Sequence, residues 1–505
     1  MTDKFSDSDA VLCTNGRLSQ PPEDILVTSA FMSELQEQLC LSEEMNRVDI
    51  AHVIGLVEAK VIKKKVGADL LNALQKLQEN PTDFQPDPKF GDLFTNRENW
   101  LEQHSSAVGW LCAGRARRES TTVAYHLTIK KILLDLADEI TALMRVMMIQ
   151  VSAHKASVMP DYTYMQPGQP TTFGHYLHSF VFMLMRDLAR IESLYGRVNC
   201  CPAGCGGING STLQIDREKL SSLLGFERPV MHARDAMWQA DISIEIASVA
   251  TSILVTLDRF CEDVLYFVTE EFNYIELQDS YSRASKIMPQ KKNPYALAYI
   301  RALANKVIGI QNMVVVSQRT PTGQIDNRLF LYGEIPFVLK KSIEGIGLLK
   351  NAVEGLQFKT SNAVNRIRES YAMAAELAEQ ISVENNLDYR TAHKIVGKIV
   401  RNFMHLKKHL FELTELELNE VASDVVGHSI SCSKQILEIL NSPHVAIEKK
   451  SGLGGTSKER IKEMIEYSKQ EINYSEKWTD NEREKIKQAE NALSQHMHTI
   501  INQTQ

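Results

Sequence analysis

The chain has 505 residues, which is more than one compact core usually accommodates, so its length predicts two or three domains. Glycine (25) and proline (15) are scarce, which disfavours an all-β protein with many tight turns. The formal net charge of −7 argues against a general nucleic-acid binder, because phosphate binding normally needs a basic surface. The polar residues 1–20 are unlike a signal peptide and are expected to be disordered. No run approaches the ~18 apolar residues of a membrane span, so we expect a cytoplasmic protein.

Helical periodicity dominates the first half of the chain. It predicts helix over residues 29–80, a loop over 79–92 where prolines gather, and helix again from near Glu98. Residues 120–156 form one long apolar-periodic stretch. A passage rich in glycine and proline then runs from 160 to 170, before a further helix.

The segment CPAGCGGINGS (201–211) is the most glycine-dense part of the chain, which predicts a loop. Its glycines would also let backbone approach a ligand closely. Cys200, Cys201 and Cys205 cluster here, but no partner cluster follows at zinc spacing. This usage favours reduced thiols in a cytosolic protein, with a metal site as the minor alternative. We therefore predict neither a metal nor a cofactor.

Residues 233–272 are expected to form the longest helix, because apolar side chains repeat there in heptads. Such a stripe must be buried against equally long partners, for which 295–318 and 333–357 are candidates. The resulting bundle could bury its seams within one chain or between subunits. The heptad residues are Ile246, Ile253, Phe260 and Phe267, with Ala250, Leu257 and Val264 between them.

A break at 355–363 marks the start of a smaller helical region. From Trp478 the tail is charged and helical, which indicates a solvated C-terminal helix. We therefore expect an N-terminal helical domain over 1–112, a central long-helix domain over 113–360, and a small C-terminal domain with its tail helix over 361–505.

The stretch SRASKIMPQKKNP (282–294) carries four cations and no acid. Asn293 and Pro294 stand at a predicted helix start, where backbone N–H groups favour anions. Lys291 and Asn293 could hold a carboxylate there. Ser285 could act as a base if neighbouring positive charge stabilised its oxyanion. The alternative is a solvated basic loop.

This loop resembles the signature of the fumarase/aspartase superfamily, through Ala284-Ser285-x-x-Met288-x-x-Lys291-x-Asn293. The wording MPQKKNP is most similar to argininosuccinate lyases. Further segments carry the same resemblance: AGRARRES (113–120), DYTYMQPGQPTTFGHYL (161–177), PAGCGGINGSTLQIDRE (202–218), ELAEQISVENNLDYRTAHKIVGKIV (376–400) and GGTS (454–457).

The resemblance implies an all-α fold of three mostly helical domains, whose central bundles build a 20-helix core in a homotetramer. It also implies active sites that gather residues from three subunits. Members of the superfamily cleave a C–N or C–O bond by β-elimination and release fumarate. A base removes the proton beside a carboxylate, positive charge stabilises the resulting dianion, and an acid protonates the leaving group.

The resemblance also assigns roles to individual residues. Ser285 falls on the catalytic serine, and Lys291 with Asn293 on the pair that binds a carboxylate. Substrate binding is further expected of Arg117, Thr163 and Gln166.

Departures from the family pattern cluster where the amine portion of the substrate would sit. Tyr164 replaces the family histidine, Arg118 an asparagine, and Phe94 the histidine of an acidic segment. Leu331 stands where a glutamine contacts the citrulline part of argininosuccinate, and Glu334 where a lysine does. We count Tyr164 with the catalytic residues, and Arg118, Leu331 and Glu334 with the substrate-binding ones. These changes predict a different substrate, with an extra acidic group or a less guanidine-like leaving group.

The leading hypothesis is therefore a carbon–nitrogen lyase that acts on an N-substituted aspartate, a small carboxylic acid, in either direction. An isomerase, cyclase or addition enzyme on another unsaturated acid is the first alternative. A catalytically silent homologue is the second, although the retained Ser285, Lys291, Asn293, Thr163 and Arg117 oppose it.

Overall fold

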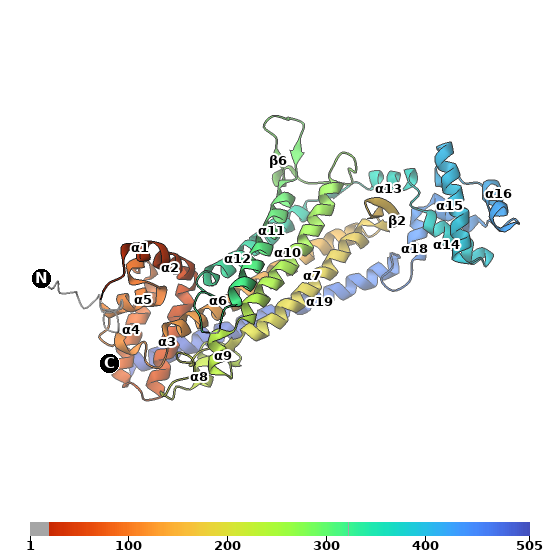
Figure 1. Ribbon diagram of the computed structural model, residues 1–505. Coiled ribbons are helices and arrows are strands. Elements are labelled where there is room, and N and C mark those ends of the chain that lie inside the picture. Colours follow the sequence, from red (N-terminus) through yellow and green to blue (C-terminus); the bar gives the residue numbers. More distant parts are fainter. Residues whose placement is uncertain (1–19, 322, 505) are drawn as a thin grey trace.

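The computed structural model describes residues 20–321 and 323–504. Helices dominate, and the strands form short pairs (Figure 1). The predicted all-α class is therefore confirmed. The segment 1–20, expected to be disordered, lies outside the described residues except for its last one. In the part described, no helix is both long and apolar enough to cross a membrane.

The first helices form a group at the beginning of the central bundle. They are α1 (Asp24–Leu26), α2 (Met32–Gln38), α3 (Ser42–Glu58), α4 (Lys64–Glu79) and α5 (Leu93–Glu102). Of these, α2, α3 and α5 contact the bundle. Helix α3 is buried on most sides between α4 and the first bundle helix. Helix α5 begins earlier than the predicted Glu98, because Asp92 caps it by accepting a hydrogen bond from Thr95 N at 2.9 Å.

Five long helices form the central bundle: α6 (Arg117–Ala153), α7 (Phe173–Val198), α10 (Asp241–Phe267), α11 (Tyr295–Gln318) and α12 (Leu331–Glu354). Helix α10 packs on α7, α11 and α12, while α6 packs on α7 and α12. The predicted heptad residues of α10 are all buried, and its predicted partners are α11 and α12. The seam read from the sequence is therefore confirmed.

The prediction of one helix over 233–272 is wrong in its bounds. A short helix, α9 (Ala233–Trp238), is separated from α10 by Gln239, whose backbone is extended. Nor is α10 the longest described helix, since α19 (Lys458–Asn502) has 45 residues. The apolar periodicity located the buried face of α10 correctly but did not show where the backbone turns.

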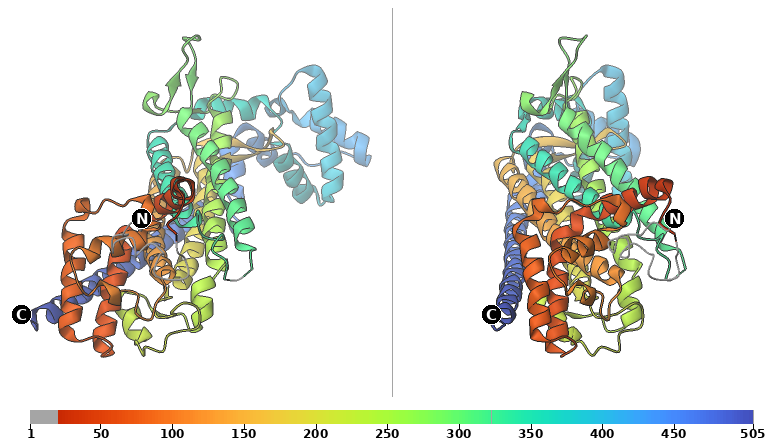
Figure 2. Two further views of the ribbon diagram at one scale, coloured as in Figure 1. Left: turned by 60° about the vertical axis from the view of Figure 1, so that its left-hand side comes forward. Right: turned by 90° about the vertical axis from the view of Figure 1, so that its left-hand side faces the viewer.

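Helix α19 runs along the flank of the bundle, as the blue helix of Figure 2 shows, and contacts α4, α6 and α7. The expected solvated tail from Trp478 is therefore wrong in its start and in its environment. Apolar residues spaced along one face of this charged helix, such as Ile461, Ile472 and Met497, are buried. Sparse apolar residues at helical spacing are enough to hold a helix of this length against a bundle.

Two β-hairpins lie at the end of the bundle where α6 ends and α7 and α11 begin. Strand β1 (Val158–Thr163) pairs antiparallel with β2 (Gln166–Thr172), and β6 (Arg283–Ala284) with β7 (Lys292–Asn293). The glycine- and proline-rich passage of 160–170 is thus largely strand. The remaining short strands are β3 (Cys200–Cys201), β4 (Arg228–Pro229), β5 (Ile275–Glu276) and β8 (Gln357–Phe358).

After α12, the chain forms a group of shorter helices with its own cluster of buried apolar residues. This group lies at the far end of the molecule from α1 to α5 (Figure 1). Its members are α13 (Thr360–Glu369), α14 (Ala374–Asn385), α15 (Tyr389–Leu406), α16 (Glu415–Val426), α17 (Lys434–Asn441) and α18 (Pro443–Lys449).

Candidate functional site

Ser285 lies directly after strand β6, in the loop of a hairpin that projects from the bundle (Figure 1). Its Oγ accepts hydrogen bonds from the backbone N–H groups of Met288 at 3.1 Å and Ile287 at 3.4 Å. Two converging N–H dipoles stabilise negative charge on the oxygen to which they point. The loop can therefore support a serine oxyanion, which is the form that acts as a base.

The loop's cations have different environments. Lys292 is held at the base of the hairpin, where its ammonium contacts Asp279 at 2.7 Å and Leu277 O at 2.5 Å. Lys291 stands directly before β7 and is exposed. Asn293 Nδ2 donates to Arg283 O at 2.8 Å, across the hairpin. Lys292 is thus a structural residue, whereas Lys291 faces solvent in the described chain.

Thr163 and Tyr164 lie at the tip of the β1–β2 hairpin, where Thr163 pairs with Gln166. The two residues of the turn, Tyr164 and Met165, have φ values of 53° and 56°. A turn of this kind needs positive φ at both positions, and residues other than glycine adopt it at a cost of roughly 1 kcal/mol or more each. The Tyr164 side chain is 99% exposed. A strained turn that presents an exposed tyrosine is typical of a functional element.

Arg117 and Arg118 occupy the first turn of α6. The N-terminus of a helix already carries partial positive charge, so two arginines make this point strongly attractive to anions. Arg117 is half exposed and its Nε lies 3.4 Å from Asp92 Oδ2. Burial and the Asp92 charge raise the pKa of Glu34, and the nearby Arg117 and Arg118 offset this only in part. Sequence reasoning missed these two acids, since each stands far from Arg117 along the chain.

Leu331 and Glu334 begin helix α12, but they face different surroundings. Leu331 is buried and lines a cavity of ≈ 30 Å³ with Thr122, Arg328 and Tyr332. Glu334 lies near Glu37, whose pKa is raised by burial and by the Glu334 charge.

Arg328 is a buried cation that sequence reasoning did not single out. Its Nη1 donates to Thr122 Oγ1 at 3.0 Å and to Tyr332 Oη at 3.3 Å. Its guanidinium also lies 4.4 Å from the Trp238 ring. The signal that could have found it is the Asn-Arg pair at the start of NRLFLYGEIP (327–336).

Two other sequence features are structural. Glu119 accepts hydrogen bonds from Gly204 N at 2.6 Å and Gly206 N at 2.5 Å. These two N–H groups of the loop 201–211 therefore bind a side chain of the fold and not a ligand. Cys205 also contacts Glu119. No group of three or more His, Cys, Asp or Glu side chains within the described ranges could hold a metal ion. Phe94 is buried against Arg115 and belongs to the core.

The predicted site residues therefore form two groups at opposite ends of the bundle. One group lies on the two hairpins, and the other at the starts of α6 and α12. Helix α6 spans 37 residues, about 55 Å at roughly 1.5 Å per residue, between Arg117 and the β1–β2 hairpin. A single chain does not bring the two groups together. The hairpin group comprises Thr163, Tyr164, Gln166, Ser285, Lys291 and Asn293, and the other comprises Arg117, Arg118, Leu331 and Glu334.

Comparison with known proteins agrees with this arrangement of helices and loops. Residues 26–309 match the family described as Lyase, and residues 371–445 match the family described as Argininosuccinate lyase C-terminal. An argininosuccinate lyase of Methanococcoides burtonii is 28% identical over 464 residues, covering 90% of this chain and 92% of the relative. That of Thermoanaerobacter pseudethanolicus is 30% identical over 418 residues, covering 80% and 92%.

Solved structures share the fold. An EDDS lyase in complex with formate superposes with a TM-score of 0.86 at 22% identity, covering 96% of this chain and 97% of the other. A β-carboxy-cis,cis-muconate cycloisomerase of Acinetobacter calcoaceticus gives 0.66 at 17% identity, covering 88% and 97%. The chain therefore belongs to the lyase family of the fumarase/aspartase superfamily, close to the argininosuccinate lyases, and is a carbon–nitrogen lyase of the fumarate-releasing type.

Proposed function

We propose that this enzyme eliminates an amine other than arginine from an N-substituted aspartate, giving fumarate, or catalyses the reverse addition. The observation that carries the proposal is the Ser285 Oγ held by two backbone N–H groups, on a loop with the family's signature. Oxyanion stabilisation of this kind supports proton abstraction. The proposed change of substrate is supported by Arg118, Leu331 and Glu334, which replace family residues that face the amine portion.

The chemistry would proceed by proton abstraction beside a carboxylate. The Ser285 oxyanion takes the proton from the carbon next to that carboxylate, which becomes a doubly charged aci-carboxylate. Lys291 and Arg117 attract this dianion more strongly than they attract the singly charged carboxylate of the bound substrate. Such preferential stabilisation of the transition state is what accelerates the reaction. The electron pair next forms the double bond of fumarate as the C–N bond breaks. Tyr164 is our candidate for the acid that protonates the departing amine.

The surroundings of Arg118 support an acidic leaving group. Arg117 and Arg118 lie together at the positive end of α6. Burial lowers the pKa of Arg118, as do the Arg117 and Arg328 charges, whereas Tyr332 and Glu34 raise it. Leu331 offers no amide where the family uses glutamine. An amine that carries its own carboxylate would gain from these cations and would not need that amide.

We further propose that complete sites form only between chains, in a cytoplasmic homotetramer. The two groups of site residues lie about 55 Å apart along one bundle, on the rise of roughly 1.5 Å per residue. Mixing the inactive variants Ser285→Ala and Arg117→Ala should restore activity, since some mixed sites would contain neither change. Light scattering should report four chains. A monomer, or mixtures that stay inactive, would reject the shared site.

The substrate is tested with the purified protein and a panel of N-succinyl amines, including amino acids with acidic side chains. Formation or loss of fumarate absorbance is followed, and Ser285→Ala serves as the inactive control. Turnover is expected to be fastest with an acidic amine and slow with argininosuccinate. Preference for argininosuccinate would overturn the proposed specificity. No turnover on any member, with Ser285→Ala without effect, would overturn the proposed activity.

A further inference from the structure

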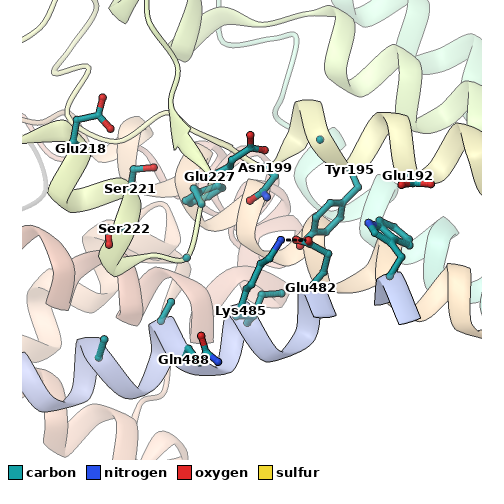
Figure 3. A pocket seen from close by; sticks show the side chains of 17 residues that line it. Glu192, Tyr195, Asn199, Glu218, Ser221, Ser222, Glu227, Glu482, Lys485 and Gln488 are labelled. Atoms are coloured by element: carbon teal, nitrogen blue, oxygen red, sulfur yellow. Dashed lines mark hydrogen bonds and ion pairs between the residues drawn. The ribbon is translucent and has the colours of Figure 1, made fainter. Parts of the chain in front are cut away.

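A second cleft lies outside the candidate catalytic site, where the end of α7, the segment around α8 (Arg217–Leu223) and helix α19 meet (Figure 3). It encloses ≈ 740 Å³, and none of its lining residues belongs to the predicted site. The volume is that of a cleft which binds small molecules. Its position on the flank separates it from the hairpins by most of the length of α7, whose 26 residues span about 39 Å at roughly 1.5 Å per residue.

The cleft is lined by four carboxylates and one lysine. The lysine, Lys485, contacts Glu482 Oε1 at 2.5 Å within α19. Glu227 is paired with Arg228 at 3.1 Å, and Glu192 accepts a hydrogen bond from Tyr474 at 2.8 Å. After these contacts the lining remains negative overall, which favours a cationic ligand. The four acids are Glu192, Glu218, Glu227 and Glu482.

Aromatic rings form a second feature of the lining. The rings of Tyr195 and Trp478 meet edge to face with centroids 5.5 Å apart, and Phe226 lies on the wall as well. Aromatic faces attract ammonium and guanidinium groups. Within this fold, the buried Lys130 already uses that attraction, because its ammonium lies 4.6 Å from the Phe226 ring while it donates to Gly225 O at 2.5 Å.

Three buried side chains of the lining, Asn199, Ser221 and Tyr195, have polar atoms without hydrogen-bond partners among the described residues. Asn199 is 7% exposed and its Oδ1 is unpartnered, as is the Oγ of Ser221, which is 2% exposed. Figure 3 shows the Asn199 amide extending toward Lys485 from the opposite wall. A buried acceptor that stays unpaired costs stability, so such groups normally have a partner. A ligand with N–H donors would supply one.

From these observations we propose that the cleft binds an organic cation with several N–H donors: a primary ammonium or guanidinium on a short aliphatic chain. Its N–H groups would donate to Asn199 and Glu482, and its chain would lie against Tyr195 and Trp478. The proposal does not depend on the catalytic function, since no lining residue takes part in it.

The test uses the full-length protein, with the cations agmatine and cadaverine as probes. Glutarate serves as the anionic control and pentanol as the uncharged one. Binding of each compound is measured by calorimetry and by thermal unfolding, once in the presence of saturating fumarate and once in the Ser285→Ala variant. A compound that binds at the catalytic site is recognised because fumarate competes with it. Both cations should bind and raise the unfolding temperature, because a ligand that binds only the folded state stabilises it. Equal responses to all four compounds, or binding that fumarate abolishes, would overturn the proposal.

Matched variants on α19 locate the binding. Glu482→Gln should weaken cation binding at least tenfold, whereas Glu484→Gln, two residues away and outside the lining, should change it less than twofold. Asn199→Leu should also weaken cation binding tenfold. Without ligand, the unfolding temperature of this variant should be no lower than that of the wild type, because the substitution removes an unpaired acceptor. If Asn199→Leu fails to fold, its amide is structural and Glu482→Gln alone decides. Equal affinity in Glu482→Gln and Glu484→Gln would refute the site.

Discussion

The two ends of the central bundle differ in how their polar and charged groups are packed. At the hairpin end, the predicted reactive groups stand on short exposed loops, with Tyr164 at 99% exposure and Ser285 bonded only within its own loop. At the other end, charges are buried and compensated. Asp49 accepts hydrogen bonds from Arg97, Arg115 and Ser120. Groups proposed to react are left unpacked, whereas the Asp49 carboxylate and the two arginines that it binds are held by the core.

The difference follows from what each group must do. An exposed loop makes few buried contacts, so it can change position at little free-energy cost when substrate arrives. A buried ion pair cannot move so easily, since separating it would leave charges without partners. Substitution of Ser285 should therefore affect activity without affecting stability, and substitution of the buried Asp49 should affect stability. The following predictions test this contrast.

The largest expected effect is on catalysis. Ser285→Ala should lower kcat on the order of 10³- to 10⁴-fold, because it removes the proposed base. Its unfolding temperature should not change. Ser282→Ala is the matched control, since Ser282 only donates to Gln278 O at 3.1 Å in the same loop. A similar loss of activity in both variants would assign the effect to loop structure instead of the base.

The opposite result is expected at the packed end. Asp49→Asn should lower the free energy of unfolding by about 3–5 kcal/mol, because it leaves Arg97 and Arg115 buried without their counter-charge. Asp258→Asn, which breaks an exposed pair with Arg301 at 3.0 Å, should cost about 1 kcal/mol or less. Urea unfolding measures both. Equal costs would contradict the distinction between buried and exposed charge.

Acid should weaken the packed bundle through two buried histidines. Burial lowers the pKa of His126 and of His178 to about 4, below the ordinary 6.5. The unfolded chain then binds more protons between these values, so stability falls as pH decreases from 6.5 to 4, by up to about 3 kcal/mol per histidine. The urea midpoints of the wild type and of His178→Gln should converge as the pH falls from 6.5 to 4, because only the wild type loses the contribution of His178. A constant difference between them would show that His178 does not titrate there.

Specificity should respond at the start of α12. The double variant Leu331→Gln with Glu334→Lys restores the family residues and should raise kcat/KM for argininosuccinate by about tenfold, roughly 1.4 kcal/mol. Leu331 is buried, so the new amide should also cost about 1–3 kcal/mol of stability. The single variant Glu334→Gln separates charge from the buried position. Unchanged selectivity in the double variant would place the specificity elsewhere.

The smallest effect is expected at the strained hairpin. Met165→Gly removes a side chain from a residue with φ of 56° and should stabilise the fold by up to about 1 kcal/mol, less the chain entropy of glycine. Met165→Ala keeps the strain and should not stabilise. Thermal unfolding measures both, and a gain in the alanine variant would mean that Met165 is unfavourable for another reason.

Sequence reasoning succeeded where a pattern repeats along one element. The heptads of α10 predicted its buried face, and the loop 282–294 predicted the start of α11. It failed where an element has no local marker. The turn at Tyr164 and Met165 lacks the glycine or asparagine typical of such hairpins, so the strands around it were not predicted. The apolar residues of α19 are too widely spaced among charges to reveal that it is packed.

By itself, the sequence determined the helical class, the burial of α10 and the chemical character of the loop that holds Ser285, because periodicity and motif spacing are properties of one segment. Only the tertiary structure decided that Arg117 and Ser285 lie at opposite ends of a bundle, and that Asn199 and Ser221 face a cleft beside α19. The physical reason is that a rigid helix carries its two ends far apart, while burial depends on which helices pack together, and neither distance nor packing partner is written in a local pattern.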